Sequence, residues 1–205
     1  MIKIDKTDVY GWEAAIRGMR NPLNSWDKSD SVFTMGDTFV GENDLSLMKR
    51  LVKAGSDHSK FMRMITVTCD ITAPLYWWKE YDTYKVGTVA NSCSTMHTIH
   101  KKEFSWDDFS FEHLLQDEAT EFMKHLICGL NYYRTIYLKT KDKTYWYQMI
   151  QLLPSSYNQL RTVQLNYAAL RNIYHARKNH KLSEWHTFCE WIESLPYSEL
   201  ITERD

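Results

Sequence analysis

The stretch FMRMITVTCDIT, residues 61–72, alternates between apolar and polar side chains. Its odd positions carry most of the apolar side chains, at Phe61, Ile65, Val67, Cys69 and Ile71. Successive side chains of a β-strand point to opposite faces, so a period of two predicts a strand with one buried face. Arg63 interrupts that face near the expected start of the strand. The chain is therefore expected to contain a sheet with other elements packed on one side.

Helical patterns dominate the rest of the chain. Apolar spacing, together with Gly and Pro stops, predicts helices over 9–21, 42–55, 75–84, 117–140, 144–153, 168–180 and 183–195. In the longest helix, the apolar spacing of three or four residues is carried by Phe122, Leu126, Leu130 and Tyr133. Ser183 is expected to cap the last helix.

Three segments lack a helical period. Residues 22–41 and 85–99 are expected to be loops, and QLRTVQLNY at 159–167 is expected to be a short strand or an extended segment. Helices outnumber strands, and the two do not alternate strictly along the chain. We therefore predict an α+β fold that forms a single domain over residues 1–205.

The charges of the chain are balanced, with 25 basic and 26 acidic residues and a net charge of −1. This balance argues against a protein held to nucleic acid or to an anionic membrane by its overall field. No apolar run approaches the roughly 20 residues that span a bilayer. The beginning, MIKIDKTDVYGWE, lacks the apolar centre of a signal peptide. We expect a cytoplasmic protein with neither nucleic acid nor a membrane as its partner.

The cysteines are spread along the chain without a CxxC pair, at Cys69, Cys93, Cys128 and Cys189. We expect free thiols and no metal site. Cys93 lies in a segment rich in Ser and Thr, where His97 is a candidate base for a thiol nucleophile. The motifs GxGxxG, GxxxxGK, HExxH and GxSxG are all absent, which argues against a P-loop enzyme or a common hydrolase.

The order of parts from residue 45 onward is distinctive. A helix that ends in Gly leads to a strand, then to Ala-Pro, an aromatic helix and a loop rich in Ser and Asn. Leu-Pro, an extended segment and an Asn-bearing helix that ends in Arg follow. In this order the chain resembles the flavin-dependent thymidylate synthases over two blocks, 45–97 and 152–195. The resemblance implies a central antiparallel or mixed sheet flanked by helices.

Enzymes of that family make thymidylate from deoxyuridylate (dUMP) with FAD, NADPH and methylene-tetrahydrofolate, and they work as homotetramers. The resemblance therefore implies FAD as cofactor, a dUMP-like nucleotide and a folate as ligands, and a homotetrameric assembly. The implied reaction is methyl transfer to dUMP with reductive hydride transfer from flavin.

The family signature reads RHR, two residues, Ser, one residue, Asn-Glu, one residue, Ser, one residue, Arg-Tyr. Its cationic side chains bind flavin and nucleotide phosphates through charge-assisted hydrogen bonds. In YDTYKVGTVANSCSTMH, residues 81–97, Thr83-Tyr84-Lys85 stands in place of RHR. Asn91 and Ser94 match the signature as they stand. The resemblance assigns cofactor binding to Tyr84 and Lys85, and binding of the nucleotide phosphate to Thr88, Asn91, Ser92 and Ser94.

The segment LNYAALRNIYHAR, residues 165–177, keeps more of the family's pattern, with Asn166, Asn172 and Arg177 in place. The resemblance implies that Asn172 contacts flavin and that Arg177, the catalytic candidate, holds and polarises the uracil ring. A histidine of the family that lies near the flavin corresponds either to His180 or to the position of Lys181, where it is lost. Asn172 and Arg177 are separated by about 140° on an ideal helix, so both reach one site only if the helix ends near Arg177.

Three functions stay open at this point. The chain is a thymidylate synthase of this type, a non-catalytic homologue that binds a nucleotide or a protein partner, or an enzyme that modifies another nucleotide. The replacement of RHR favours the second. Each candidate also has an interpretation without function. Arg177 is typical of a solvated helix C-terminus, where its charge complements the helix dipole, and Ser92 and Ser94 are typical of an ordinary polar loop. Trp77 and Trp78 are expected in a helical core or a subunit contact rather than stacked on a ligand.

Overall fold

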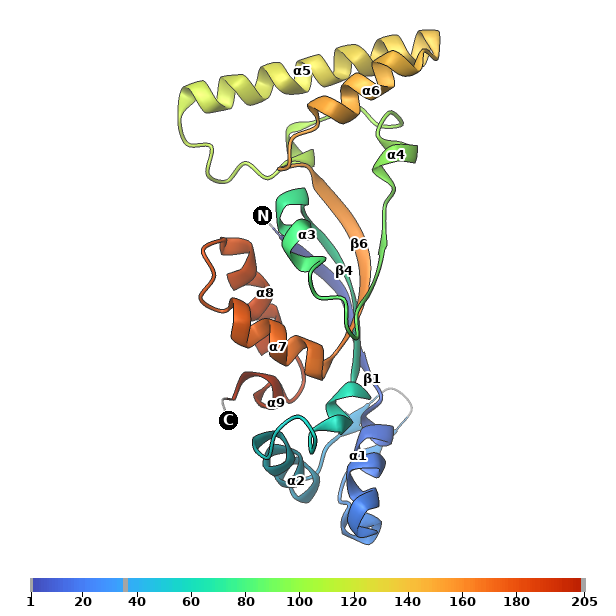
Figure 1. Cartoon of the computed structure of the whole chain (residues 1–205), viewed down its shortest axis with the longest axis vertical. Helices are drawn as coiled ribbons and strands as arrows, with labels where there is room; N and C mark the ends of the chain where they lie inside the picture. The colour runs from blue at the N-terminus through green and yellow to red at the C-terminus, as the bar shows by residue number, and fades with distance from the viewer. Residues whose placement is uncertain (1, 35–36, 204–205) are drawn as a thin grey trace. The chain divides into compact units, whose positions relative to one another are not determined.

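The computed structural model of the protein describes residues 2–34 and 37–203 (Figure 1). The chain divides into two compact units. The first unit comprises the first residues of the chain together with 71–83 and 91–162. The second unit comprises 4–70, 84–90 and the residues from 163 onward.

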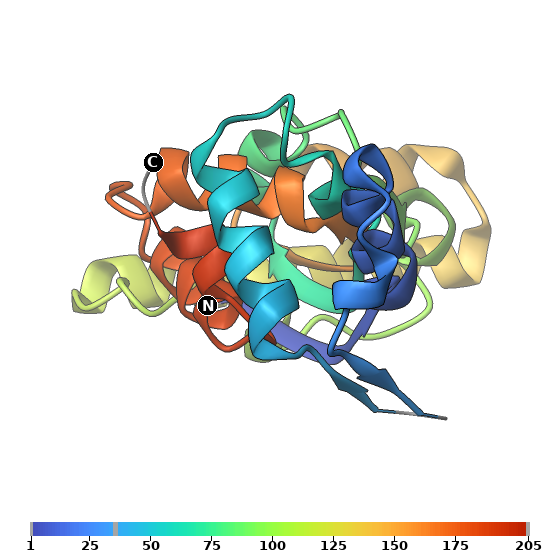
Figure 2. The same ribbon diagram turned by 90° about the horizontal axis from the view of Figure 1, so that it is seen from below.

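Four strands form the larger sheet, in the order β1–β4–β6–β5. Their bounds are Lys3–Tyr10 for β1, Thr66–Pro74 for β4, Asn158–Asn166 for β6 and Val89–Ser92 for β5. A smaller antiparallel pair, β2 (Val32–Phe33) and β3 (Thr38–Phe39), forms a hairpin whose strands lie side by side in Figure 2. Helices and antiparallel strands together confirm the predicted α+β class.

The alternating segment forms β4, but it begins later than predicted. Its inward positions are at most 1% exposed, at Val67, Cys69, Ile71 and Ala73. Residues 60–63 instead form a short 3-10 helix, η3 (Lys60–Arg63), in which Phe61 is buried and Arg63 is exposed. Arg63 therefore lies outside the strand, and the predicted interruption of the buried face is wrong. The cause is local, because the N–H of Met64 bonds to the carbonyl of Phe61 at 2.9 Å and closes a turn before the strand.

The second unit begins with β1, which the sequence analysis did not predict. The helix predicted from residue 9 begins only at Trp12, as α1 (Trp12–Arg20). Gly11 makes the change of direction at φ 91°. A Cβ on Gly11 would lie 2.1 Å from the carbonyl oxygen of Met64, so no larger residue fits there. The predicted helix at 42–55 is observed as α2 (Glu42–Lys53).

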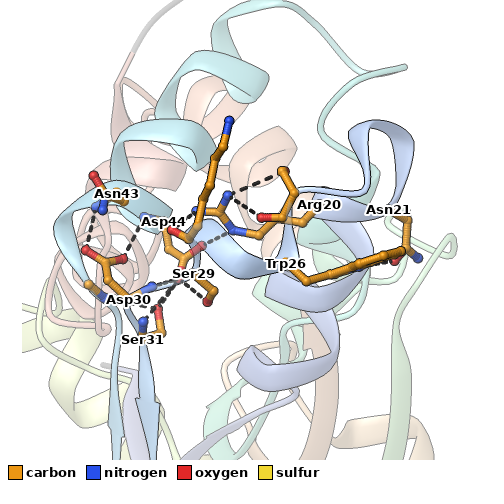
Figure 3. Close-up of polar contacts among 11 residues, drawn as sticks. Arg20, Asn21, Trp26, Ser29, Asp30, Ser31, Asn43 and Asp44 are labelled. Atoms are coloured by element: carbon orange, nitrogen blue, oxygen red, sulfur yellow. Dashed lines mark hydrogen bonds and ion pairs between the residues drawn. The ribbon is translucent and has the colours of Figure 1, made fainter.

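The segment between α1 and α2 contains more regular structure than the loop predicted for 22–41, of which residues 35 and 36 lie outside the described part of the chain. It contains two 3-10 turns, η1 (Asn21–Leu23) and η2 (Trp26–Lys28), and then the β2–β3 hairpin. A buried ion pair between α1 and α2 forms hydrogen bonds with this segment and so holds it against both helices (Figure 3). Nε of Arg20, at the end of α1, donates to Oδ1 of Asp44 in α2 at 2.6 Å, with the side chains 4% and 0% exposed.

The second carboxylate oxygen of Asp44 binds the segment itself. Hydroxyl groups of Ser29 and Ser31 donate to Oδ2 at 2.7 and 2.6 Å, and two backbone N–H groups add bonds at 3.2 Å. The carboxylate of Asp30 accepts from the N–H groups of Asn43 and Asp44 in the first turn of α2. Hydrogen bonds to both oxygens offset the cost of burying the charge of Asp44.

The helices at the carboxyl end of the chain pack around α7 (Tyr167–Arg177). The buried side chains of α7 are Tyr167, Leu170, Ile173 and Tyr174. Both α8 (Ser183–Glu193) and α9 (Glu199–Thr202) contact α7. The residues of α8 that are fully buried are Trp185, Phe188 and Ile192. The cap predicted for Ser183 is wrong by one residue, because Leu182 holds the N-cap position.

The first unit contains α3 (Leu75–Tyr81), α4 (Thr95–Thr98) and a packed helix pair, α5 (Asp117–Thr140) and α6 (Lys143–Leu152). Its core is formed by Ile99, Phe104, Phe109, Met123, Leu130 and Met149. Of the apolar residues spaced along α5, Leu130 is buried, whereas Phe122 is 77% exposed and the neighbouring Met123 is buried. Trp77 and Trp78 are at most 1% exposed, as expected of a helical core. Within the described residues, no helix is both long and apolar enough to cross a bilayer.

The predicted loop at 85–99 is wrong for two of its parts. Residues 89–92 form β5, which is the edge strand beside β6. Residues 95–98 form α4, and the hydroxyl of Ser94 caps it by accepting from the N–H of His97 at 3.3 Å. Neither element shows a clear period in the sequence, because an exposed edge strand and a single helical turn bury too few side chains to impose one.

Candidate functional site

Arg177 is the last residue of α7, and aromatic side chains of the second unit enclose its guanidinium group. Nε donates a hydrogen bond to the hydroxyl of Tyr84 at 2.7 Å. The guanidinium carbon lies 5.4 Å from the centre of the Tyr84 ring and 4.9 Å from that of Trp185. Contacts of this kind attract a cation to the ring face. Arg177 is half-buried and held by tertiary contacts, so it is more than a solvated helix end.

Trp185 provides the fixed part of this arrangement. It lies in the first turn of α8 with no solvent exposure, and its ring meets those of Phe188 and Tyr84 nearly edge-on. The ring of His180 lies 6.3 Å from it, centre to centre. Nδ1 of His180 accepts from the N–H of Leu182 at 3.2 Å, which holds the turn between α7 and α8.

The segment 84–88 runs along α7. The hydroxyl of Thr88 donates to the carbonyl of Tyr84 and closes the segment into a turn. Gly87 has φ 73°, and a Cβ there would lie 2.7 Å from the amide nitrogen of Asn166. Asn166 in turn caps α7, accepting from the N–H of Ala169 at 2.9 Å. The segment therefore contacts α7 at both ends, through Gly87 and Asn166 at the start and through Tyr84 and Arg177 at the end.

A cavity of about 540 Å³ opens on another side of α7, where Asn172 is exposed. Its walls come from α2, the turn after α2, η3 and α7, and its lining residues are Val52, Gly55, Ser56, Ser59, Met62, Ala168, Arg171, Asn172 and His175. Its volume lies within the range of small-molecule sites. Val52 and Met62 form its floor and are only 6% and 1% exposed, while hydroxyl, amide and imidazole groups surround the opening.

The C-terminal segment fixes one wall of this cavity. One terminal nitrogen of Arg171 donates to the carbonyls of Ile201 and Glu203 at 3.1 and 2.6 Å. Nε2 of His175 lies 3.0 Å from the carbonyl of Ile201. Burial and the nearby charge of Arg171 lower the pKa of His175, which keeps its imidazole neutral near pH 7. Neutral imidazole adds no second cation beside Arg171.

The structure brings together some of the residues that the sequence singled out. Tyr84, Thr88 and Arg177 belong to one cluster, His180 joins them through Trp185, and Asn172 faces the separate cavity on the same helix. Lys85 is exposed in the same segment. Asn91, Ser92 and Ser94 belong to the first unit, where Asn91 and Ser92 are exposed on β5 and Ser94 caps α4.

Trp185 was not singled out as a site residue, although it supports Arg177. Apolar spacing in residues 183–195 indicates that Trp185 is buried, but it does not indicate which distant side chain Trp185 contacts. The contact between Tyr84 and Arg177 was equally invisible, because 93 positions separate the two residues. The described residues contain no group of three or more His, Cys, Asp or Glu side chains arranged to hold a metal ion.

A larger cavity, about 930 Å³, lies beside the start of α1 in the second unit. It is lined by residues of β1, α1 and the hairpin, and by residues 194–197 after α8. None of the residues picked out by the sequence motifs lines it. We therefore take α7, with Arg177 at its end and Asn172 on its side, as the candidate site.

No protein-family model matches the chain, and no curated protein matches its sequence. Solved structures do match. Two crystal structures of the flavin-dependent thymidylate synthase ThyX from Helicobacter pylori, both with FAD and dUMP, align with a TM-score of 0.71 at 17% and 16% identity. Each alignment covers 98% of this chain and 98% of the other.

A third structure is a UMP/dUMP methylase, PolB from Streptomyces cacaoi, bound with 5-Br dUMP. It aligns with a TM-score of 0.65 at 13% identity, over 98% of this chain and 95% of the other. At such low identities the likeness establishes the fold. The predicted thymidylate synthase-like fold is therefore confirmed.

Proposed function

We propose that this protein binds FAD and a uridine-type 5′-monophosphate, and that it methylates the uracil ring as a flavin-dependent thymidylate synthase does. dUMP is the first candidate substrate. The proposal is carried by one observation on α7, where Asn172 lines a ligand-sized cavity and Arg177 ends the same helix in a fixed position. The fold shared with proteins that bind FAD and dUMP supports it.

The residues around Asn172 suit the isoalloxazine ring of a flavin. Val52 and Met62 form an apolar floor that is only 6% and 1% exposed, so hydrogen bonding carries the recognition. The amide of Asn172 can both donate to and accept from the ring's nitrogen and oxygen atoms. The hydroxyls of Ser56 and Ser59 add further hydrogen-bonding groups. When bound, the flavin would supply the hydride that reduces the transferred carbon to a methyl group. This step requires the flavin ring to extend beyond the cavity to the nucleotide, because Arg177 does not line that cavity.

Arg177 would act on the nucleotide. A guanidinium group always carries its charge, so it stabilises negative charge that develops on a uracil carbonyl during attack on the ring. Lys85 and His180, with Tyr84, are proposed to contact the cofactor. Thr88, Asn91, Ser92 and Ser94 are proposed to contact the nucleotide phosphate. Methylene-tetrahydrofolate and NADPH would supply the carbon and the electrons, and we propose a homotetramer located in the cytoplasm.

Flavin binding is tested by absorbance and by titration with FAD. We expect the purified protein to be yellow or to take up FAD, and we expect Asn172→Ala to weaken FAD binding by about tenfold through loss of a hydrogen-bonding amide. Asn179→Ala is the matched control, because Asn179 is exposed beyond the end of α7 and does not line the cavity. Protein that stays colourless and binds no added FAD contradicts the flavin part of the proposal.

Nucleotide binding is tested by calorimetry with dUMP and UMP. Arg177→Gln should weaken binding by at least about tenfold, since a charged partner of the nucleotide is lost. Arg63→Gln removes an exposed arginine in η3 and should leave binding unchanged. Formation of the methylated nucleotide, followed by mass spectrometry with all three co-substrates present, tests the reaction itself.

A second candidate is a non-catalytic homologue that kept nucleotide binding. The specific observation in its favour is Thr83-Tyr84-Lys85, which leaves one cation where three are expected. The two candidates differ in flavin binding. Uptake of a uridylate without any uptake of FAD, and without a methylated product, identifies the non-catalytic homologue.

A further inference from the structure

The side chain of Gln159, the second residue of β6, holds the segment 93–95 that leads into α4. Its amide nitrogen Nε2 donates to the carbonyl of Cys93 at 2.9 Å and to the hydroxyl oxygen of Thr95 at 3.2 Å. The N–H of Cys93 donates to the carbonyl of Leu160, also on β6, at 2.9 Å. Both backbone polar groups of Cys93 are therefore bonded to the same strand. All of these residues belong to the first unit.

The orientation of the Gln159 amide is set from its other side by Arg161. Nε of Arg161 donates to Oε1 of Gln159 at 3.0 Å. A guanidinium nitrogen only donates, so the amide oxygen must face Arg161 and the amide nitrogen must face the carbonyl of Cys93. An amide turned the other way would bring two donors together on one side and two acceptors together on the other. The hydrogen bonds therefore select one orientation of this side chain.

Arg161 is itself held by contacts with α3 and with the residue that follows α3. Its guanidinium carbon lies 4.2 Å from the centre of the Trp78 ring, and Trp78 is 1% exposed. Its terminal nitrogen Nη1 donates to Oδ1 of Asp82 at 2.7 Å. Nε1 of Trp78 donates to the carbonyl of Gln159 at 3.0 Å. Connected contacts therefore run from the buried Trp78 through Arg161 and Gln159 to the segment 93–95.

Ser94 lies in the middle of the segment that Gln159 holds. Its hydroxyl oxygen accepts the N–H of His97, and a hydroxyl that accepts a hydrogen bond keeps its own hydrogen to donate. The oxygen atoms of a phosphate accept such hydrogen bonds and shorten them through their charge. Because residues on both sides of Ser94 are fixed before a ligand arrives, less conformational freedom is lost when the ligand binds.

We propose that Gln159 is a positioning residue for the nucleotide phosphate, because it fixes the segment 93–95 so that Ser94 can donate to that phosphate. Arg161 acts through Gln159, and neither side chain needs to contact the nucleotide. The role rests on the proposed function in one respect, since that function assigns Ser94 to the nucleotide phosphate.

The first test is hydrogen–deuterium exchange of the protein without ligand, followed by mass spectrometry. Gln159→Leu keeps an uncharged side chain and removes both hydrogen-bonding groups. We expect the backbone amides of 93–99 to exchange about fivefold faster in this variant, and the amides of α7 to exchange as before. Unchanged exchange over 93–99 overturns the inference. An equal increase in both segments indicates general destabilisation and overturns it as well.

The second test compares dUMP with deoxyuridine, which has the same ring and sugar but no phosphate, in calorimetric titrations. Gln159→Leu should weaken the binding of dUMP by about fivefold and leave the binding of deoxyuridine unchanged. A merely structural defect would weaken both, and that result overturns the inference, as does unchanged binding of dUMP. Gln151→Ala, at an exposed glutamine of α6, is the control and should change neither.

The part of Arg161 is tested by Arg161→Lys, which keeps the charge and removes the Nε–H that Gln159 accepts. We expect about threefold weaker binding of dUMP in the unaltered background and no further change in the Q159L background, because Arg161 acts through Gln159. Equal weakening in both backgrounds overturns this part of the inference.

The two proposals fail in different ways. If the unaltered protein binds dUMP and Q159L binds it equally well, the proposed function stands and the positioning role is overturned. If the unaltered protein binds neither dUMP nor UMP, the proposed function fails, and the positioning role for the nucleotide phosphate fails with it.

Discussion

Asp44 carries a charge at a position with no solvent exposure, and every contact described for it is a hydrogen bond or an ion pair. Its partners come from α1 and from the segment that follows α1, so one carboxylate joins two helices and a long connection. A buried charge is tolerated only when its partners are complete. The stability of this part of the second unit should therefore depend on single side chains.

Asp44→Asn should destabilise the protein by about 3 kcal/mol, because Arg20 would remain buried without its counter-charge. The free energy of unfolding in urea measures this. Glu13→Gln is the matched control, since it breaks an ion pair on the same helix α1 in which both side chains are about two-thirds exposed. Exposed pairs contribute little, so the control should unfold like the unaltered protein. Equal urea midpoints for the Asp44 variant and the control would contradict this prediction.

The carboxylate of Asp44 should also make the stability of the protein depend on pH. Burial raises the pKa of Asp44, but hydrogen bonds from Ser31, Ser29 and Arg20 outweigh burial and hold it below its ordinary value. The unfolded chain then takes up a proton at higher pH than the folded protein does. The stability that Asp44 provides is complete above the unfolded pKa of about 3.9 and is lost as pH falls through the lower folded value.

Urea unfolding from neutral pH down to about pH 3 checks this expectation. The unaltered protein should lose stability more steeply at the acid end than Asp44→Asn, in which position 44 has no carboxyl to titrate. If the free energy of unfolding falls equally with pH in both proteins at the acid end, Asp44 does not contribute in this way.

At the scale of elements, α7 was predicted well and the segment that contacts it was not. The helix has caps and a buried face that are visible in its own sequence, from Asn166 through Tyr174. The segment 84–88 has no period, and its conformation depends on α7, which lies some eighty positions further along the chain. Local sequence carries little information about such an arrangement, because its contacts are almost all non-local.

Gly87→Ala should destabilise the protein by roughly 1–2 kcal/mol and weaken uridylate binding. Alanine is strained at φ 73°, and its Cβ would displace the Asn166 side chain that caps α7. Gly129→Ala is the control, and we expect it to change the free energy of unfolding in the opposite direction. Gly129 lies inside α5 with open space around it, so alanine there should stabilise by up to about 1 kcal/mol. Urea unfolding of both variants, with calorimetry on the first, tests the pair; two changes of the same sign would contradict it.

At the scale of the whole molecule, the fold is shared with ThyX and PolB at identities of 13–17%. Fold likeness at this level fixes the arrangement of elements and leaves the chemistry to particular side chains. The proposed function therefore depends on Asn172 and Arg177 more than on the overall match.

The proposed homotetramer is tested by sedimentation equilibrium. We expect the mass of four chains of 24.4 kDa each. Exposed apolar side chains that an assembly could cover include Leu115 at 81% and Phe122 at 77% exposure in the first unit. Phe122→Glu would place a charge in any contact that uses this side chain and should reduce the mass. Lys124→Glu is the control and should not, because Lys124 is also exposed but lies two residues further along α5, on the opposite side of the helix. A monomer mass for the unaltered protein would contradict the tetramer.

The sequence by itself determined the helices α2, α5, α6, α7 and α8 to within a few residues, the buried face of β4 and the α+β class. These features follow from periodicity and from caps, which act over one or two turns of chain. The resemblance of its motifs to a known family also singled out Asn172 and Arg177.

Only the tertiary structure decided that Tyr84 binds Arg177, that Trp185 supports it, that Asn172 lines a cavity and that Arg20 and Asp44 form a buried pair. These contacts join residues that are 8 to 93 positions apart. Each depends on a backbone direction set elsewhere, such as the left-handed turns at Gly11 and Gly87. A periodic pattern records which side of an element is buried, and it does not record which distant side chain lies against it.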